Sequence, residues 1–325
     1  MESPLAAILD PWLTRPETHD WESPRSRCLA SIRDLRFMEP RPELLQAAMV
    51  YWDPVMHVFC FRNDEICPTM EEFQSYLRGF TDCEVLAIPP FQEGMSQLVQ
   101  TKLNIPEELS ASIIQNGNLN IVRLIELYGP EGALGDYVGQ AHKRFVLSIC
   151  ALAAYMLISA GEGVCPSIVS IALQMDARKN IMPVVLAETL MGLDLVKSGQ
   201  ASWFSGCPLL LQSENIVWRC PWLNLLVMTV NSAGFKGVVL AGLTSFTFYV
   251  PGRTLRQLGT SQESRCFGRE RFELPTFDSH NMRAYEYSWN NRELEEPLPD
   301  PITWLESHYV KWLHREVKAR SRGYF

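Results

Sequence analysis

The feature that most constrains the fold of this chain is a series of apolar segments that begin directly after a proline. Proline suits the first turn of a helix, because the amide that it lacks has no intrahelical acceptor there. In the longest of these segments Leu186, Leu190 and Leu193 recur at helical spacing and should face the core. Runs that alternate apolar and polar residues are scarce, so the sequence predicts a mainly α protein. The segments are Glu107–Gln115, Ser167–Met175 and Val184–Lys197, after Pro106, Pro166 and Pro183.

Apolar spacing predicts further helices on both sides of this series. Phe145–Gly161 is the longest uncharged run, but it falls short of the roughly 20 apolar residues that a bilayer span needs. We therefore expect a buried core helix there and no membrane segment. Asn116-Gly117 should end the helix that begins at Glu107. The further helices are Cys28–Leu35, Glu43–Trp52, Leu119–Tyr128, Phe145–Ser159, Pro208–Cys220, Trp222–Ala233, Arg253–Leu258 and Ile302–Arg320.

Two stretches are typical of short β-hairpins. Val55–Cys67 holds "VMHVFCF" and "IC" on either side of the polar turn "RNDE". Val238–Val250 is rich in β-branched and aromatic residues and should turn near Gly242. The expected fold is a compact multi-helix domain with these two small hairpins.

The chain of 325 residues has no internal repeat, and its composition changes along its length. We expect an irregular N-terminal arm at 1–42, a helical core at 43–259, a polar connection at 260–299, and a C-terminal helix at 300–325 that packs on the core. The polar connection is sparse in aliphatic residues, which is why it is expected to be loosely ordered.

Composition and charge exclude some classes of protein. Hydrophobic residues make up 47% and charged residues 20%, as in a globular protein with a sizeable core. The net charge of −8 argues against a wholly basic protein that coats phosphates, but not against a local basic patch. Nine cysteines with no C-x-x-C pair, and no secretory signal, indicate a reducing compartment with free thiols and a protein that is not secreted.

A cluster of polar residues between Tyr51 and Leu77 raises the question of a metal or acid/base site. Thr69 and Glu72 fit a capping box, so Glu71 and Glu72 belong to the first turn of a helix, where the helix dipole favours carboxylates. This helix should bury Met70, Phe73 and Leu77. The cluster comprises Asp53, His57, Asp64, Glu65, Cys67, Glu71 and Glu72.

His57 is the most suggestive member of this cluster. Its position predicts a strand face shared with Phe59 and Phe61. A metal site would require His57 and Cys67 to converge with a carboxylate, and no spacing in the sequence enforces that. We therefore interpret the cluster as structural and expect no metal.

Five stretches carry a family resemblance, in order along most of the chain. They are "WDPVMHVFCFRNDEICPTMEEFQSYL" (Trp52–Leu77), "RKNIMPVVLAETLMGLD" (Arg178–Asp194), "GCPLLLQSENIVW" (Gly206–Trp218), "VVLAGLTSFTFYVPGRTLRQLG" (Val238–Gly259) and "WLESHYVKWLHREVK" (Trp304–Lys318). Together they resemble the plant mobile domain group, also labelled aminotransferase-like, and most closely a retroelement-associated plant branch catalogued as a domain of unknown function. The chain departs from that pattern at Gly206-Cys207, where the family has two cysteines, and at "TSFTFY", where its hairpin is rich in glycine.

The resemblance implies a mostly helical domain carried by plant transposable elements and by cellular relatives. Those relatives are nuclear and are linked to transposon silencing and genome stability. The resemblance supplies no agreed catalytic residues. It therefore favours a non-enzymatic interaction module that binds protein or nucleic acid.

The alternative is a cryptic enzyme, most sharply one that depends on pyridoxal phosphate. Lys236 in "NSAGFKG" is the most plausible Schiff-base lysine, although a turn lysine explains it as well. "GPEGALG" (Gly129–Gly135) lacks the G-K-[ST] ending of a phosphate loop. No catalytic constellation is visible, so no catalytic residue, cofactor or metal ligand is assigned. A buried, convergent polar cluster would favour the enzyme.

The C-terminal helix should have two different faces. Its apolar face should dock on the core through Ile302, Leu305, Tyr309 and Trp312. The other face carries a basic stripe on an otherwise acidic protein. It is either a solvated helix face or a contact for nucleic-acid phosphates or an acidic protein partner. The basic stripe consists of His308, Lys311, Arg315, Lys318 and Arg322.

Overall fold

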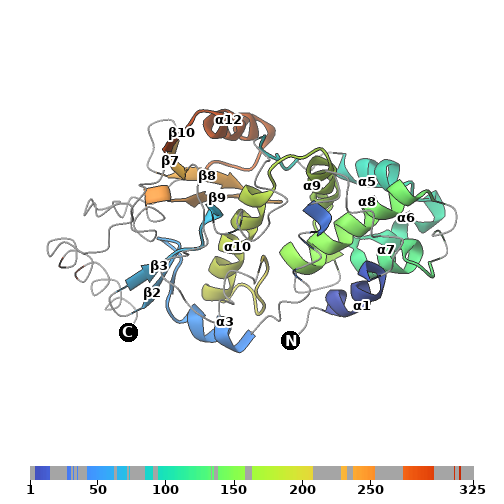
Figure 1. The fold of residues 1–325 in the computed structure, drawn as a ribbon, viewed down its shortest axis with the longest axis horizontal. Helices are drawn as coiled ribbons and strands as arrows, with labels where there is room; N and C mark the ends of the chain where they lie inside the picture. Colours follow the sequence, from blue (N-terminus) through green and yellow to red (C-terminus); the bar gives the residue numbers. More distant parts are fainter. Residues whose placement is uncertain are drawn as a thin grey trace.

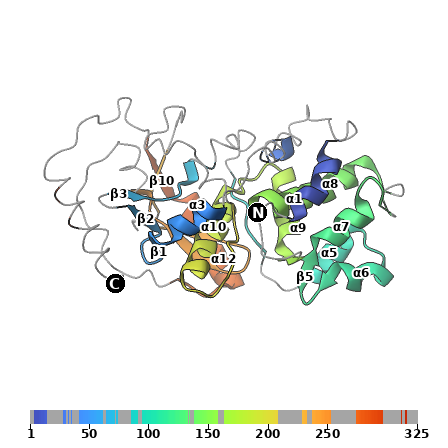
Figure 2. The ribbon, with the colours of Figure 1, turned by 90° about the horizontal axis from the view of Figure 1, so that it is seen from below.

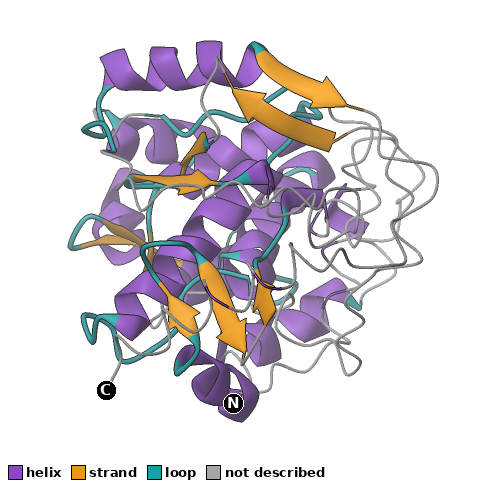
Figure 3. Ribbon diagram, turned by 90° about the vertical axis from the view of Figure 1, so that its left-hand side faces the viewer, coloured by secondary structure: helices purple, strands orange, loops and turns teal. Residues whose placement is uncertain are grey.

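The computed structural model of the 325-residue chain is rich in helices. It describes residues 4–14, 28–30, 32, 35, 42–61, 64–71, 73, 85–90, 94–132, 134, 138–157, 163–207, 228–232, 237–252, 274–295, 311 and 315. The strands among them form small antiparallel sheets set between the helices (Figure 3). The structure is therefore helix-rich with more β structure than a mainly α prediction implies.

Helices α1, α5, α6, α7, α8 and α9 lie on one side of the molecule, and α3, α10, α12 and most strands lie on the other (Figures 1 and 2). The helices are α1 Pro4–Leu13, α3 Pro42–Met49, α5 Met95–Leu103, α6 Glu107–Ile113, α7 Ile121–Tyr128, α8 Gln140–Ala151, the π-helix η4 Leu152–Met156, α9 Ser167–Asp176, α10 Met182–Lys197 and α12 Ser279–Asn290. The strands are β1 Trp52–Asp53, β2 Val58–Phe61, β3 Asp64–Ile66, β4 Ile114–Gln115, β5 Asn118–Asn120, β6 Gly163–Val164, β7 Met228–Ser232, β8 Val238–Ala241, β9 Phe246–Tyr249 and β10 Arg292–Glu295.

The proline-led helices form as the sequence predicts. α9 follows Pro166, and α10 carries Pro183 in its first turn. Leu186, Leu190 and Leu193 of α10 are buried. Residues 145–156 of the long uncharged run lie in α8 and η4, and residues 146–156 are buried. Residues 158–161 lie outside the described residues. Among the described residues, no helix is long and apolar enough to cross a membrane.

Both predicted hairpins are present. β2 pairs with β3 in the register Phe59↔Ile66, and β1 extends this sheet to three strands. β8 pairs with β9 in the register Val238↔Tyr249. Contacts from α10 and α12 cover the second hairpin.

The N-terminal segment that was expected to be irregular contains α1. Leu5, Leu9 and Leu13 of α1 are buried in the same apolar cluster that reaches Trp289. α1 packs on α7, α8 and η4, so it belongs to the core. Pro11 lies inside this helix, and its presence hid the i, i+4, i+8 spacing of the leucines.

Asn116-Gly117 forms a hairpin turn between β4 and β5, where we had expected only a helix end. Both residues have positive φ, +50° and +77°, as the turn that matches strand twist requires. α7 begins at Ile121. Asn120 caps this helix, because its side chain accepts a hydrogen bond from the Arg123 amide (2.9 Å). The helical periodicity on either side concealed two very short strands.

Two further expectations were wrong. Residues 228–232 are strand β7, paired with β10, although Trp222–Ala233 was predicted to be a helix. The polar connection at 260–299 contains α12 and β10. α12 buries Met282, Tyr285 and Trp289 at i, i+3 and i+7. A count of aliphatic residues misses such a face, because aromatic rings supply most of it.

Some predictions fall outside the described residues. They include the helices at Pro208–Cys220 and Arg253–Leu258, the capping residue Glu72, Leu77, the candidate Lys236, and most of the C-terminal helix.

Candidate functional site

His57 lies in the turn between β1 and β2, not on the strand face predicted with Phe59 and Phe61. Its φ is +51°, in the left-handed region that non-glycine residues seldom occupy. Such a conformation persists only where surrounding contacts enforce it. The turn is closed by Asp53, whose Oδ1 accepts hydrogen bonds from the amides of Val55 (2.9 Å) and Met56 (3.1 Å).

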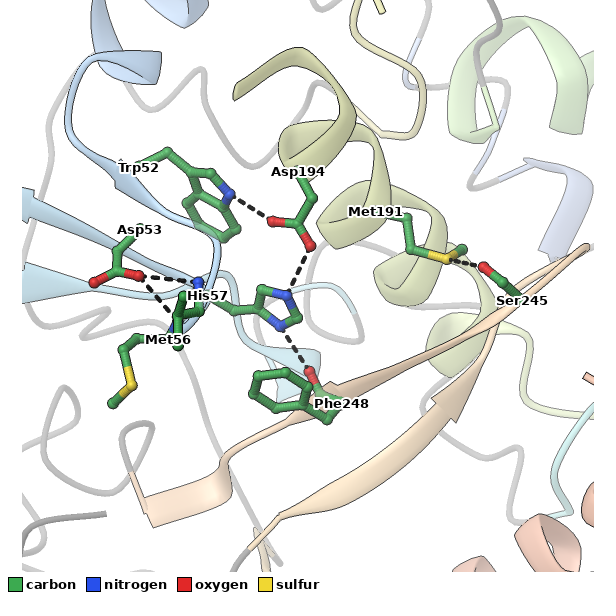
Figure 4. A network of polar contacts seen from close by, with 9 residues as sticks. Trp52, Asp53, Met56, His57, Met191, Asp194, Ser245 and Phe248 are labelled. Carbon is green, nitrogen blue, oxygen red and sulfur yellow. Dashed lines mark hydrogen bonds and ion pairs between the residues drawn. The ribbon is translucent and has the colours of Figure 1, made fainter. Parts of the chain in front are cut away.

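Both ring nitrogens of His57 contact acceptors on distant elements (Figure 4). Nδ1 lies 3.0 Å from the carbonyl oxygen of Phe248 on β9. Nε2 lies 2.9 Å from Oδ2 of Asp194 on α10. The His57 ring also stacks on Phe248, with 4.2 Å between ring centroids. His57 thereby joins the β1–β2 turn to a helix and to a hairpin.

Asp194 is shared between His57 and Trp52. Its Oδ1 accepts a hydrogen bond from Nε1 of the buried Trp52 (2.8 Å). Trp52 stacks on His57 with an interplanar angle of 10°. One carboxylate therefore satisfies two buried ring N–H groups from β1 and the following turn. We call Trp52, His57, Asp194 and Phe248 the His57 network.

The Phe248 carbonyl and the Asp194 carboxylate can only accept hydrogen bonds, so the number of protons on the His57 ring determines how many of these contacts are hydrogen bonds. A neutral imidazole has one N–H, so it can donate to the Phe248 carbonyl or to Asp194, but not to both. The doubly protonated ring donates to both and places its charge beside the Asp194 carboxylate. In this arrangement neither ring nitrogen is available to take a proton from a substrate or to bind a metal.

A small cavity lies beside this network. Its space of about 10 Å³ is close to the minimum that holds one water molecule. Cys67 and His57 both line it, so they converge although nothing in their spacing required this. Within the described ranges, no group of three His, Cys, Asp or Glu side chains is arranged to hold a metal ion. The cavity is lined by His57, Cys67, Pro68, Leu190, Phe248, Tyr249 and Val250.

Glu71 belongs to the same neighbourhood. Its side chain is buried, and its Oε2 accepts a hydrogen bond from the Tyr249 hydroxyl (2.9 Å). Thr69 is also fully buried, at the start of the short helix that carries Met70 and Phe73 in the core. Glu71 lies in the first turn of this helix, as the sequence predicts, and it also contacts Tyr249 on β9. Asp64 and Glu65 lie in β3.

α10 carries two more ionisable groups that bind backbone atoms of neighbouring elements. Glu188 Oε1 accepts a hydrogen bond from the Leu243 amide (2.6 Å), and burial raises the pKa of this carboxyl. Lys197 Nζ donates to the carbonyls of Met49 (3.0 Å) and Val50 (2.9 Å) at the C-terminal end of α3. Burial lowers the pKa of Lys197, and Asp53 and Cys60 oppose that shift. Figure 4 also shows Ser245 donating to the Met191 sulfur of α10 (2.7 Å).

The glycine at position 206 has a steric explanation. Gly206 has φ +118°, and a Cβ built on it would lie 2.6 Å from the Cα of Thr189. The next residue, Cys207, donates its amide to Thr189 Oγ1 (3.0 Å). A second cysteine does not fit here without a shift of the backbone.

Two members of the basic stripe are described. Lys311 and Arg315 are helical and exposed, and Arg315 Nε donates to the Lys311 carbonyl (3.2 Å). They are four residues apart, so they share one helix face. His308, Lys318 and Arg322 lie outside the described residues.

His57 and Glu71 stand out as polar residues in the sequence, but their partners do not. Asp194 lies 137 residues from His57, and the acceptor on Phe248 is a backbone carbonyl. An acidic residue near the end of an apolar helix was the signal available for Asp194. Comparison of the chain with protein-family models, with curated proteins and with solved structures finds no match.

Proposed function

We propose that this chain is a non-enzymatic interaction module of the plant mobile domain type, of retroelement origin, which acts in the nucleus by contacting nucleic acid or an acidic protein. The observation that carries the proposal is the exposed pair Lys311 and Arg315 on one helix face of a chain with net charge −8. A local concentration of positive charge on an acidic protein suits a partner rich in phosphates or carboxylates.

The arrangement of the His57 network supports a binding role over catalysis. Its donors and acceptors are engaged with one another, and its cavity has room for about one water molecule. The network also joins three of the stretches that carry the family resemblance, through Trp52 and His57, Asp194, and Phe248. This supports a shared core that presents its binding surface elsewhere.

The test is charge reversal in the basic stripe. The variant K311E/R315E/K318E should lose binding to short DNA or RNA duplexes, and wild-type affinity should fall steeply with added salt because binding releases condensed counterions. A matched control is K102E/R178E/R283E, which changes the net charge equally at exposed positions on other elements. The control should bind like wild type.

The binding results of these variants distinguish a nucleic-acid partner from an acidic protein partner. Equal loss in the two triple variants would show that net charge alone governs binding, and the stripe would be excluded. If wild type binds no nucleic acid even at low salt, the nucleic-acid form fails. The stripe should then be tested with acidic peptides as probes.

One observation favours the second candidate, a cryptic enzyme. His57 and Cys67 line one small cavity, and His57 also contacts the half-exposed Asp194, so three polar side chains converge as an enzyme site would require. In that function Cys67 would be a nucleophile and His57 its base, after His57 exchanges its bond to Phe248 for one to the thiol. The pyridoxal phosphate form depends on Lys236, outside the described residues.

Thiol alkylation distinguishes the two functions. An activated Cys67 should react with iodoacetamide faster than the half-buried Cys60, and the H57N substitution should slow it. The interaction module predicts the reverse order, because Cys67 is the more buried thiol. The module also predicts that purified protein lacks the absorbance of an internal aldimine and that elemental analysis finds no stoichiometric metal.

A further inference from the structure

Arg292 lies at the start of β10, directly after α12. Its guanidinium carbon sits 4.5 Å from the centroid of the Trp289 ring. Nη1 donates to the Trp289 carbonyl (2.9 Å). Tyr285 and Trp289 lie one turn apart on the buried face of α12, with 3% and 1% exposure. The three side chains thus gather where α12 meets β10.

Each of these side chains has a buried polar atom without a hydrogen-bond partner. They are Arg292 Nε, Trp289 Nε1 and the Tyr285 hydroxyl. The amide of Ala241 faces the hydroxyl oxygen of Tyr285, so it offers the hydroxyl proton no acceptor. Most buried polar groups in native proteins are satisfied, so three neighbouring exceptions require an explanation. All three can donate, and what they lack is an acceptor.

Arg292 carries a charge next to these donors. Within the described part of the chain no carboxylate forms an ion pair with it, and burial lowers its pKa. Burial also raises the pKa of Tyr285, so its hydroxyl keeps the proton that it can donate. A half-buried cation surrounded by neutral donors favours an anion.

The geometry of the guanidinium narrows the chemical class of that anion. Nη1 is occupied by the Trp289 carbonyl, which leaves the edge formed by Nε and Nη2. This edge matches the two coplanar oxygens of a carboxylate. A single positive charge balances a carboxylate, whereas a phosphate dianion would leave excess negative charge among aromatic rings.

We propose that Arg292, Trp289 and Tyr285 form a binding site for a carboxylate group. Arg292 is partly exposed and can meet a ligand from solvent, whereas the donors of Trp289 and Tyr285 are buried. The site is independent of the basic stripe and of the proposed function. Its ligand is either a small carboxylate or the acidic side chain of a partner.

The test uses the indole N–H signal of Trp289 in nitrogen-15 NMR spectra of the full chain. The chain has nine tryptophans, and the signal missing from W289F identifies the right one. Acetate is titrated against chloride at constant ionic strength. The Trp289 signal should shift saturably in wild type and in K311E/R315E, and it should not shift in R292Q. N-acetyl-glutamate amide serves as the second probe, and a tighter response to it than to acetate identifies a peptide side chain as the ligand.

Two results would overturn the proposal. One is an unmoved Trp289 signal in wild type up to 100 mM acetate, roughly the concentration needed for the weakest specific site. The other is an equal shift in R292Q. If R292Q does not fold, R292K replaces it, since lysine keeps the charge and the aliphatic stem but lacks the two-donor edge. R292K should weaken acetate binding at least several-fold, and unchanged binding would contradict the site.

Discussion

The two sides of the molecule are held together by different interactions. On the side of α1, α7, α8 and α9, the elements meet through buried apolar side chains such as Leu9, Leu124 and Leu147. Around α10, buried polar groups bridge elements that are far apart in sequence. His57 contacts Asp194 there, and Tyr249 donates to Glu71. The ionisable residues around α10 therefore connect elements that are far apart in sequence.

The polar bridges should respond to small chemical changes that the apolar side tolerates. Apolar burial depends on area and volume, so isosteric changes that leave both unchanged have little effect there. A buried donor or acceptor that loses its partner is penalised by the full cost of desolvation. Matched substitutions on the two sides therefore test whether the polar contacts around α10 are more sensitive to small chemical changes than the apolar contacts on the other side.

The largest effect is expected for Asp194→Ala. The change leaves the N–H groups of Trp52 and His57 without an acceptor, which should lower the free energy of unfolding by about 2 to 3 kcal/mol. The exposed Asp176 at the end of α9 provides the control, and Asp176→Ala should change it by less than about 0.5 kcal/mol. Urea titrations measure both. Similar losses of unfolding free energy in the two variants would show that the contacts of Asp194 contribute no more to stability than an exposed carboxylate does.

Tyr249→Phe comes next, because it removes the hydroxyl that donates to the buried carboxylate of Glu71. A hydrogen bond to a charged group contributes about 1.5 to 3 kcal/mol. Tyr128 on the apolar side is equally buried, and its hydroxyl donates to the neutral carbonyl of Leu103 (2.7 Å). Tyr128→Phe should cost about 1 kcal/mol. A reversed order would show that charge does not distinguish the two sides.

Thr69→Ala should have a smaller effect. The loss of a helix N-cap costs about 1 kcal/mol. The change should lower the melting temperature without altering nucleic-acid binding at a permissive temperature. An unchanged melting temperature together with lost binding would place Thr69 in a functional site.

Glu188→Gln is expected to have the smallest effect, and it should raise stability where the preceding substitutions lower it. Burial raises the pKa of Glu188, so the folded protein retains this proton to higher pH than the unfolded chain. Wild type should therefore lose stability as pH rises above the ordinary glutamate pKa of about 4.3 and through the raised folded value. The glutamine still accepts from the Leu243 amide. The variant should gain stability over wild type with rising pH, and a constant difference would contradict this assignment.

The sequence predicted the elements whose stability is local. Helices α9 and α10 follow from a proline and an apolar period, and the β8–β9 hairpin follows from its β-branched and aromatic residues. α1 and α12 were missed because Pro11 interrupts one pattern and aromatic residues carry the other. The strand β7 could not be predicted, since its partner β10 lies about 60 residues further along the chain.

Of the His57 network, only His57 itself was predictable from the sequence. His57 was singled out by its type and its crowded neighbourhood. Its left-handed backbone, its bond to a backbone carbonyl and its pairing with Asp194 arise only from tertiary packing. A spacing rule describes one element at a time, so it cannot bring three elements together.

We infer that His57 and Asp194 stabilise the fold as a pair. The most direct test is a double-mutant cycle of H57N and D194N, followed by urea unfolding at neutral pH. Asparagine tolerates the left-handed backbone at position 57. We predict a coupling free energy of about 1.5 to 3 kcal/mol, as expected for a hydrogen-bonded charged pair. A coupling near zero, with both single variants folded, would contradict the claim and return the pair to consideration as a catalytic site.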